Sequence, residues 1–268
     1  MLKQRLIPTL LLQNGQIVKS IGFKEYQVIG NPQVAIRFFN AWAVDEIIFL
    51  DITKNQDYTS RVRTDYNFKP LESFAEIVAA CAKTCFVPLS VGGGIKTIEQ
   101  MKIYIKAGAD KIVINSEGVR RPELITQAAE LFGRQAVIVS IDAKTNAAGA
   151  HEVFINFGQT PTGLVAADWA IEAEKRGAGE IFLTSIDQDG RLSGYDLTLL
   201  KSVTARVKIP VIASGGIGSW PDLVDGITVG GAAAVAAANI FHFKEQSTRD
   251  AKKYMTDAGL NVRISTHN

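Results

Sequence analysis

Short apolar runs alternate with amphipathic stretches from one end of the chain to the other. The apolar runs have the length of buried strands, and the stretches between them carry apolar residues at helical spacing. The predicted strands are Leu6–Leu12, Glu46–Asp51, Val87–Val91, Lys111–Asn115, Ala136–Asp142, Glu180–Ser185, Val211–Ser214 and Ala234–Ala238. The predicted helices are Pro32–Ala43, Leu71–Lys83, Ile98–Ala107, Pro122–Phe132, Ala166–Arg176, Leu197–Val207, Pro221–Val229 and Thr248–Ala258. Eight strands, each followed by a helix, favour an α/β fold of the (β/α)8 TIM-barrel type over the alternative, a doubly wound sheet, which usually has fewer strands.

The chain also contains an internal repeat. "VDEIIFLDI" (Val44–Ile52) is echoed by "AGEIFLTSI" (Ala178–Ile186), and "VGGGI" (Val91–Ile95) is echoed by "ASGGI" (Ala213–Ile217). The two copies of the second motif are separated by fewer residues than the two copies of the first. The reason is that the segment Lys54–Pro70 lengthens a loop between the two motifs in the first half. The repeat predicts two half-barrels of four strand–helix units each.

Composition limits the protein class. The chain has 268 residues, of which 47% are hydrophobic and 21% charged, as in soluble globular proteins, and we expect one domain over residues 1–268. A net charge of +2 is too balanced to favour nucleic acid or membrane as a partner, and no signal peptide or spanning segment is recognisable, so we expect a cytoplasmic protein. Cys81 and Cys85, four apart on a predicted helix, are expected to be free thiols. No metal or other cofactor is expected.

Each half contains a glycine cluster where a strand ends and a helix follows. The clusters are Gly92–Gly94 and Gly215–Gly216, and the next strand in each half ends in polar residues, Asn115–Ser116 and Asn239. Glycine lets the backbone approach an anion closely, and a following helix N-terminus offers free N–H groups. Two matched clusters predict two phosphate sites and an elongated substrate phosphorylated at both ends. The alternative is that both clusters only form tight turns.

Carboxylates at strand ends are candidates for proton transfer. Asp142 ends the fifth predicted strand, and Asp187 and Asp189 follow the sixth. Side chains at the C-terminal ends of barrel strands face the active site, where a carboxylate can act as general acid or base. We favour a role in proton transfer for Asp142 and a capping role for Asp187. Asp51 has the same strand-end position, and either role fits it equally well.

Charged residues also begin several strands. Because strand side chains alternate, Arg5 and Leu11 point to the same side of the first strand. If that side faces inward, a charge-balanced ring closes the bottom of the barrel: Arg5, Glu46, Lys111 and Glu180. Four such charges are costly to bury unless they are paired. Ordinary salt bridges that stabilise this end of the barrel are an equally good interpretation of the pattern alone.

Sequence motifs along nearly the whole chain resemble the cyclase subunit of imidazole glycerol phosphate synthase. The motifs are "IPTLLLQNGQIVK", "FLDIT", "VGGGI", "GADKIVINS", "SIDAK", "EKRGAGEIFLTSIDQDG", "SGYD", "IPVIASGGIG", "FHFKE" and "GLNVR". The resemblance implies a (β/α)8 barrel with a glutaminase docked at its N-terminal face. It also implies that ammonia passes through the bore to the top, where it reacts with a bisphosphorylated ribulosyl intermediate.

The resemblance further implies roles for individual residues. The phosphate contacts fall on Gly94, Asn115, Ser116, Ser214, Gly216, Ala238 and Asn239. In the family the four ring positions form an ammonia gate, so the resemblance favours a gate over ordinary salt bridges for Arg5, Glu46, Lys111 and Glu180. Asp110 matches a carboxylate that meets the glutaminase, Lys19 a lysine of the mobile first loop, and Thr184 and Asp189 substrate-contacting positions.

One catalytic position departs from the family pattern. The cyclase uses two aspartates, and the second is present as Asp142, but the first is replaced by Leu11, which cannot transfer a proton. Phe157 stands where the hairpin after the fifth strand carries a serine in the family, and Asn239 replaces a phosphate-binding serine. The extended segment Lys54–Pro70 is a further difference. The resemblance therefore implies an enzyme by family with weak or no cyclase activity on its own.

The triple leucine Leu10–Leu12 resembles a divergent branch of this family that is associated with a second glutaminase and a sugar-modifying amidotransferase. That branch is linked to acetamidino sugars of bacterial surface polysaccharide. Our leading hypothesis is a barrel subunit that channels ammonia to such an amidotransferase. The alternatives are a genuine cyclase of histidine biosynthesis, in which another group replaces the missing carboxylate, and a scaffold that conducts nothing.

Overall fold

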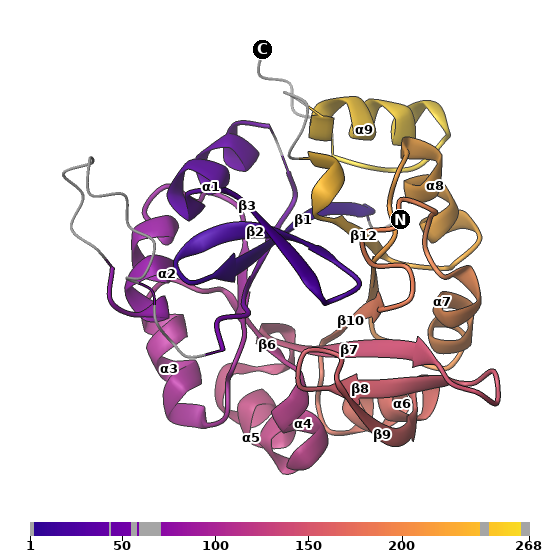
Figure 1. The fold of residues 1–268 in the computed structure, drawn as a ribbon, viewed down its shortest axis with the longest axis horizontal. Helices are drawn as coiled ribbons and strands as arrows, with labels where there is room; N and C mark the ends of the chain where they lie inside the picture. Colours follow the sequence, from indigo (N-terminus) through magenta and orange to yellow (C-terminus); the bar gives the residue numbers. More distant parts are fainter. Residues whose placement is uncertain (1–2, 43, 55–57, 59–70, 242–246, 264–268) are drawn as a thin grey trace.

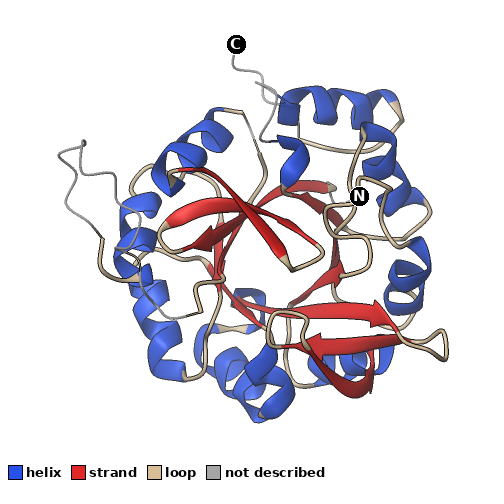
Figure 2. Cartoon of the chain, viewed as in Figure 1, coloured by secondary structure: helices blue, strands red, loops and turns tan. Residues whose placement is uncertain are grey.

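The protein forms a closed barrel of eight parallel strands surrounded by helices (Figures 1 and 2). The structure is a computed structural model that describes residues 3–42, 44–54, 58, 71–241 and 247–263. The barrel strands, in order around the barrel, are β1 (Arg5–Gln13), β4 (Ile47–Asp51), β5 (Leu89–Gly92), β6 (Lys111–Ile114), β7 (Val137–Thr145), β10 (Glu180–Ser185), β11 (Val211–Ser214) and β12 (Ala234–Ala237). Pairing of β12 with β1 and of β7 with β10 completes the circle. The predicted TIM barrel is confirmed.

Helices follow the barrel strands and cover the outside of the barrel (Figure 2). They are α1 (Pro32–Ala41), α2 (Phe74–Ala82), α3 (Ile98–Lys106), α4 (Ser116–Arg120), α5 (Glu123–Phe132), α6 (Ala166–Lys175), α7 (Leu197–Thr204), α8 (Trp220–Thr228) and α9 (Ser247–Asp257), with short 3-10 turns η1 (Arg134–Ala136) and η2 (Asn239–Phe241). Side-chain caps fix several starts. Ser73 accepts a hydrogen bond from the Glu76 N–H, so α2 begins three residues after the predicted Leu71. None of the described helices is long and apolar enough to cross a membrane.

Two antiparallel hairpins extend the barrel at its C-terminal end. β2 (Gln16–Ile21) and β3 (Glu25–Gly30) follow β1, and β8 (His151–Ile155) and β9 (Thr160–Val165) follow β7. In Figure 1 the β2–β3 hairpin crosses in front of the barrel opening. The hydrophobic pattern predicted neither hairpin. Because they follow the first and the fifth barrel strands, they occupy matching places in the two halves, in agreement with the sequence repeat.

Two apolar cores hold the barrel together. The larger lies between strands and helices and includes Phe49, Leu89 and Met101, all almost completely buried. The smaller fills the inside of the barrel with Ile7, Ile48, Val113, Ile138, Phe182, Ile212, Ala234 and Ala236. Each predicted ring residue precedes a member of this inner core by two positions, so the ring side chains point into the bore as the alternation predicted.

Candidate functional site

A cavity of about 440 Å³ opens at the C-terminal ends of the barrel strands. It is lined by residues from both halves of the chain, among them the roof residues Phe23 and Tyr26 of the β2–β3 hairpin. Many residues singled out from the sequence line it, among them Leu11, Gly94, Asn115, Ser116, Asp142, Phe157, Thr184, Asp189, Ser214, Gly216 and Ala238. Such a cavity at this end of a TIM barrel is where active sites of the fold lie.

Asp142 is the carboxylate best placed for proton transfer. The Asn115 Nδ2 donates to its Oδ2 at 2.9 Å, and the same nitrogen donates to Ser140 Oγ at 3.3 Å. Desolvation raises the pKa of Asp142 to about 7; the hydrogen bonds from Asn115 and Ser140 oppose the rise, and the nearby charge of Asp189 adds to it. A carboxyl group that titrates near neutral pH can both accept and donate a proton under physiological conditions.

The raised pKa makes a prediction for stability. An aspartate titrates near 3.9 in an unfolded chain, so ionisation of Asp142 destabilises the native state increasingly from about pH 4 up to pH 7 and by a constant amount above that. Asp142→Asn should therefore be more stable than the parent by about 1–2 kcal/mol at pH 8, a figure that allows for solvent in the cavity. At pH 4 the two should be equal. Urea unfolding of both proteins at the two pH values measures this, and an equal stability at pH 8 contradicts the assigned environment.

Leu11 lines the cavity at the matching position of the first half. It pairs with Leu50 of the neighbouring strand β4, and Leu50 lines the cavity as well. Leucine has no proton to exchange and no hydrogen-bonding group. The first-half wall is therefore apolar at this point, where the second half presents the Asp142 carboxylate.

Asp189 binds the hairpin that roofs the cavity. Its Oδ2 accepts hydrogen bonds from Ser20 Oγ at 2.7 Å and from the Phe23 N–H at 3.2 Å, and its backbone carbonyl accepts one from the Gly22 N–H. Desolvation raises the pKa of Asp189, and these hydrogen bonds reduce the shift. Tyr26 also lines the cavity, and its hydroxyl donates to the Phe23 carbonyl. Sequence reasoning placed Asp189 at the substrate but missed Ser20, Phe23 and Tyr26.

The two glycine clusters differ in what surrounds them. A Cβ built on Gly94, which has φ +61°, meets nothing within 4 Å, so this residue borders open space in the cavity. A Cβ on Gly216 would lie 2.1 Å from the carbonyl oxygen of Gly194, whose N–H in turn donates to the Gly216 carbonyl. The packing of one loop on another is thus sufficient to explain Gly216. In the first cluster, Gly94 faces open space, and its positive φ rather than close packing favours glycine there.

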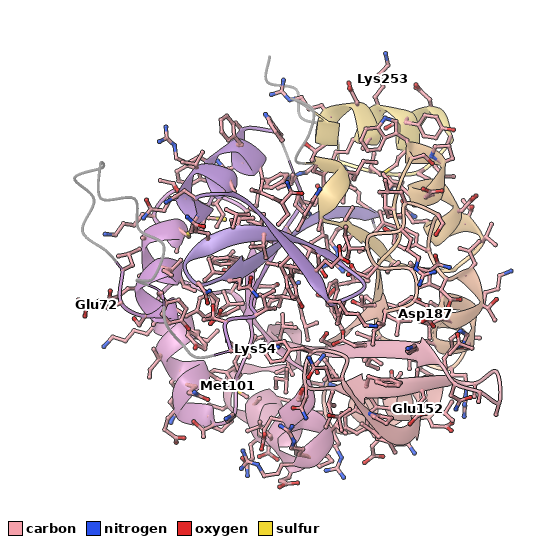
Figure 3. All side chains as sticks on the ribbon, viewed as in Figure 1. Lys54, Glu72, Met101, Glu152, Asp187 and Lys253 are labelled. Atoms are coloured by element: carbon pink, nitrogen blue, oxygen red, sulfur yellow. The ribbon has the colours of Figure 1, made fainter. Side chains whose placement is uncertain are left out.

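Cations line the cavity on the side of the first cluster. They are Lys54, Lys96 and Arg120. In Figure 3 Lys54 lies toward the centre of the view, whereas Glu72 and Lys253 lie at the outer edge of the molecule. The Ser116 hydroxyl is engaged there, donating to Asn115 Oδ1 and accepting from the Asn156 N–H. Among the described lining residues, none on the side of Gly216 is a lysine or arginine.

One predicted contact, Lys19, is not brought to the cavity, and the side chain of a second, Asn239, lies outside the described residues. Lys19 lies on β2 and borders a separate small hollow of the hairpin with Glu25 and Gln27, so it is absent from the described lining of the main cavity. Asn239 begins η2, and its side chain lies outside the described residues, as does most of the Lys54–Pro70 segment. Alternation along β2 explains Lys19, because the next residue, Ser20, lines the cavity and Lys19 therefore points to the other side of the hairpin.

These differences predict unequal phosphate binding. Inorganic phosphate should bind at Gly94 and Ser116 in preference to Gly216, because Lys54, Lys96 and Arg120 line the first side and outnumber the Glu117 carboxylate that pairs with Arg120 there. Soaking crystals in phosphate and reading the occupancy of the two places measures this. Arg120→Ala should lower the occupancy at Gly94, with Lys253→Ala on the outer surface as control. Higher occupancy at Gly216 would contradict the asymmetry.

At the opposite end of the barrel the four predicted charges meet. Each cation contacts both carboxylates: Arg5 Nη1 is 2.8 Å from Glu46 and Arg5 Nη2 2.5 Å from Glu180, and Lys111 Nζ is 2.9 Å and 2.6 Å from the same two groups. Ser90 Oγ donates to the remaining Glu46 oxygen at 2.6 Å. Burial tends to lower the pKa of Arg5, but the two glutamates outweigh it and raise that pKa. Burial tends to raise the pKa of Glu180, and Arg5 and Lys111 reverse the effect.

Three other acidic residues have structural partners. Asp110, next to the ring, is exposed, and its carboxylate accepts from the Leu89 N–H. Asp51 lines the cavity but binds the Tyr58 hydroxyl at 2.6 Å and the Thr53 N–H at 2.9 Å. Asp187 accepts from the Thr145 N–H, which fits the capping role expected for it.

The histidines and cysteines form no metal site in the described part of the chain. His151 Nε2 lies 3.1 Å from Asp196 Oδ2, a contact that the sequence did not predict. Cys81 and Cys85 are free thiols, as expected. No group of three or more histidine, cysteine or acidic side chains in the described residues could hold a metal ion.

Comparison with known families gives one match that covers most of the chain. Residues 5–247 match the family described as histidine biosynthesis protein, a stretch that includes all eight barrel strands. The matched region contains the cavity residues and the four charges of the ring. The chain belongs to the histidine biosynthesis protein family.

Proposed function

We propose that this barrel is the ammonia-conducting subunit of a glutamine amidotransferase complex. In this proposal a glutaminase binds at the N-terminal face, near the exposed Asp110 and the ring. Ammonia released there passes the ring and travels through the bore to the cavity. A separate amidotransferase then uses it to convert an acetamido sugar to an acetamidino sugar for surface polysaccharide.

The observation that carries the proposal is Leu11 in an otherwise well-formed cavity. The barrel retains Asp142 with a pKa suited to proton transfer and keeps the four-charge ring at the other end. Leu11 lines the cavity at the position where the resemblance to the cyclase subunit implies the first of two aspartates. Loss of one member of an acid/base pair commonly costs about 10²–10⁴ in rate. A paired ring of charges below a cavity that lacks one of the two expected carboxylates supports conduction of ammonia rather than cyclisation as the function of this barrel.

One observation favours a second candidate, a genuine cyclase of histidine biosynthesis. Asp189 lies near enough to Asp142 for its charge to raise the pKa of that residue, so the cavity does contain a second carboxylate. However, the Asp189 carboxylate already accepts hydrogen bonds from Ser20 and Phe23 of the roof. It would have to release the hairpin to act as the missing partner. We therefore rank the cyclase second.

Complex formation tests the proposed function. The purified barrel should bind a glutaminase of this family and, with the sugar amidotransferase present, transfer ¹⁵N from the glutamine amide into the amidino group. Asp110→Lys should weaken glutaminase binding, whereas Asp250→Lys on the outer helix α9 should not. If the barrel binds no glutaminase, or if the label reaches the sugar equally well without the barrel, the proposal fails.

A further inference from the structure

Strand β1 places a hydroxyl group deep inside the bore. The inward side chains along it are Arg5 of the ring, Ile7 of the inner core, Thr9 and Leu11. Thr9 is only 6% exposed and lines the bottom of the cavity. Its Oγ1 has no hydrogen-bond partner among the described residues. A buried hydroxyl without a partner destabilises a protein, so such an atom points to a small molecule that completes its hydrogen bonding.

Strand β7 repeats this order on the opposite side of the barrel. Ile138 belongs to the inner core, Ser140 follows two residues later with 5% exposure, and Asp142 comes two residues after that. β1 and β7 are the first and fifth of the eight barrel strands, so they face each other across the bore. Thr9 and Ser140 each lie two residues below the paired positions Leu11 and Asp142. The two half-barrels thus contribute one hydroxyl each.

The surroundings select a small, uncharged ligand. The inner core below the hydroxyls is entirely apolar, which disfavours an ion that has lost its water. The Ser140 hydroxyl receives a hydrogen bond from Asn115, which also binds Asp142, so polar contacts continue upward into the cavity. Ammonia can donate hydrogen bonds to hydroxyl oxygens and accept one through its lone pair, and water has the same ability.

We infer that Thr9 and Ser140 form a hydrogen-bonding station for ammonia between the apolar part of the bore and the cavity. The inference rests on the proposed function, since only a conducting barrel receives ammonia from below. The station gives ammonia its first polar contacts after the inner core and delivers it beside Asp142. Thr9 acts as a positioning residue and takes part in no covalent step.

A structure of the full chain tests the station without any partner. Crystals grown in ammonium sulfate should show an ordered solvent-sized peak about 3 Å from Thr9 Oγ1. Thr9→Val keeps the shape of the side chain and removes the hydroxyl, so the peak should disappear, and Thr9→Ser should restore it. An empty bore at Thr9 in the parent protein, or a peak that persists in Thr9→Val, overturns the station.

The assembled complex tests whether the station serves ammonia. In Thr9→Val the fraction of glutamine nitrogen that reaches the sugar should fall about fivefold, the equivalent of one hydrogen bond. Thr9→Ser should restore it, and Ser202→Ala on the outer helix α7 should match the parent. A peak at Thr9 combined with unchanged transfer identifies a structural water and overturns the ammonia role. Failure of the parent complex to transfer nitrogen refutes the proposed function instead, and the crystal result still decides whether the station exists.

Discussion

Lys111→Met should uncouple glutamine hydrolysis from amidination while lowering the stability of the barrel. Lys111 Nζ contacts both Glu46 and Glu180, and its side chain is largely buried. Without it, two carboxylates share the single cation Arg5 at the end of the bore. Breaking a buried ion pair by removing one partner costs about 3–5 kcal/mol, and the remaining contacts to Arg5 place the expected loss at the lower end of that range. Urea unfolding measures the loss, and the ¹⁵N transfer assay measures the uncoupling.

Matched variants separate charge from geometry in this ring. Lys111→Arg keeps the positive charge and should retain most of the stability. Lys102→Met removes an exposed lysine from the outer helix α3 and should change neither property. If Lys111→Met transfers glutamine nitrogen as efficiently as the parent, the ring is a stabilising ion-pair network and the bore is not the route of ammonia.

Leu11→Asp should increase cyclase activity by about 10–100-fold over the parent. Leu11 lines the cavity at the first-half position that matches Asp142, so an aspartate there restores a carboxylate on the wall that lacks one. General acid–base catalysis contributes about 10²–10⁴ in rate, and we expect only part of it because Phe157 lines the cavity at the position where the family carries a serine. Steady-state turnover of the bisphosphorylated ribulosyl intermediate with ammonium salt is the measurement.

The gain should depend on Asp142. Leu11→Asp combined with Asp142→Asn should return to the activity of the parent, because the two groups act as a pair and their effects are not additive. Leu11→Asn, which restores polarity without a proton-transfer group, should give no gain. If Leu11→Asp binds the intermediate but shows no increase, the shape of the cavity, and not the missing carboxylate at position 11, limits the cyclase activity of this barrel.

Much of this architecture follows from regularities in the sequence. The ring was predictable because alternation along a strand fixes which side chains point inward, and Arg5, Lys111 and Glu180 stand at the start of strands that the apolar pattern identifies. Asp142 and Asn115 were predictable because they stand at the C-terminal ends of strands that the apolar pattern identifies, and such residues face the active site in this fold. Such positions depend on local periodicity and on the fold, both of which a single sequence contains.

The roof of the cavity was not predictable in the same way. β2 and β3 mix polar and apolar residues and are partly exposed, so their pattern resembles a loop. Their position depends on contacts between distant segments, such as Ser20 with Asp189, which no local pattern specifies. The turn at Asn14–Gly15, where both residues have positive φ, was the one signal that could have indicated a hairpin after β1. It would also have placed Lys19 on that hairpin.

The rate at which the purified barrel turns over the bisphosphorylated ribulosyl intermediate with saturating ammonium salt tests the central claim most directly. Ammonium supplied in solution bypasses the glutaminase, so the assay reports only on the chemistry of the cavity around Asp142 and Leu11. If the barrel has become a conduit, it should be at least about 100-fold slower than a cyclase subunit that has both aspartates, the lower limit for losing one acid/base partner. A rate within tenfold of such a subunit would contradict the account and identify the protein as a working cyclase.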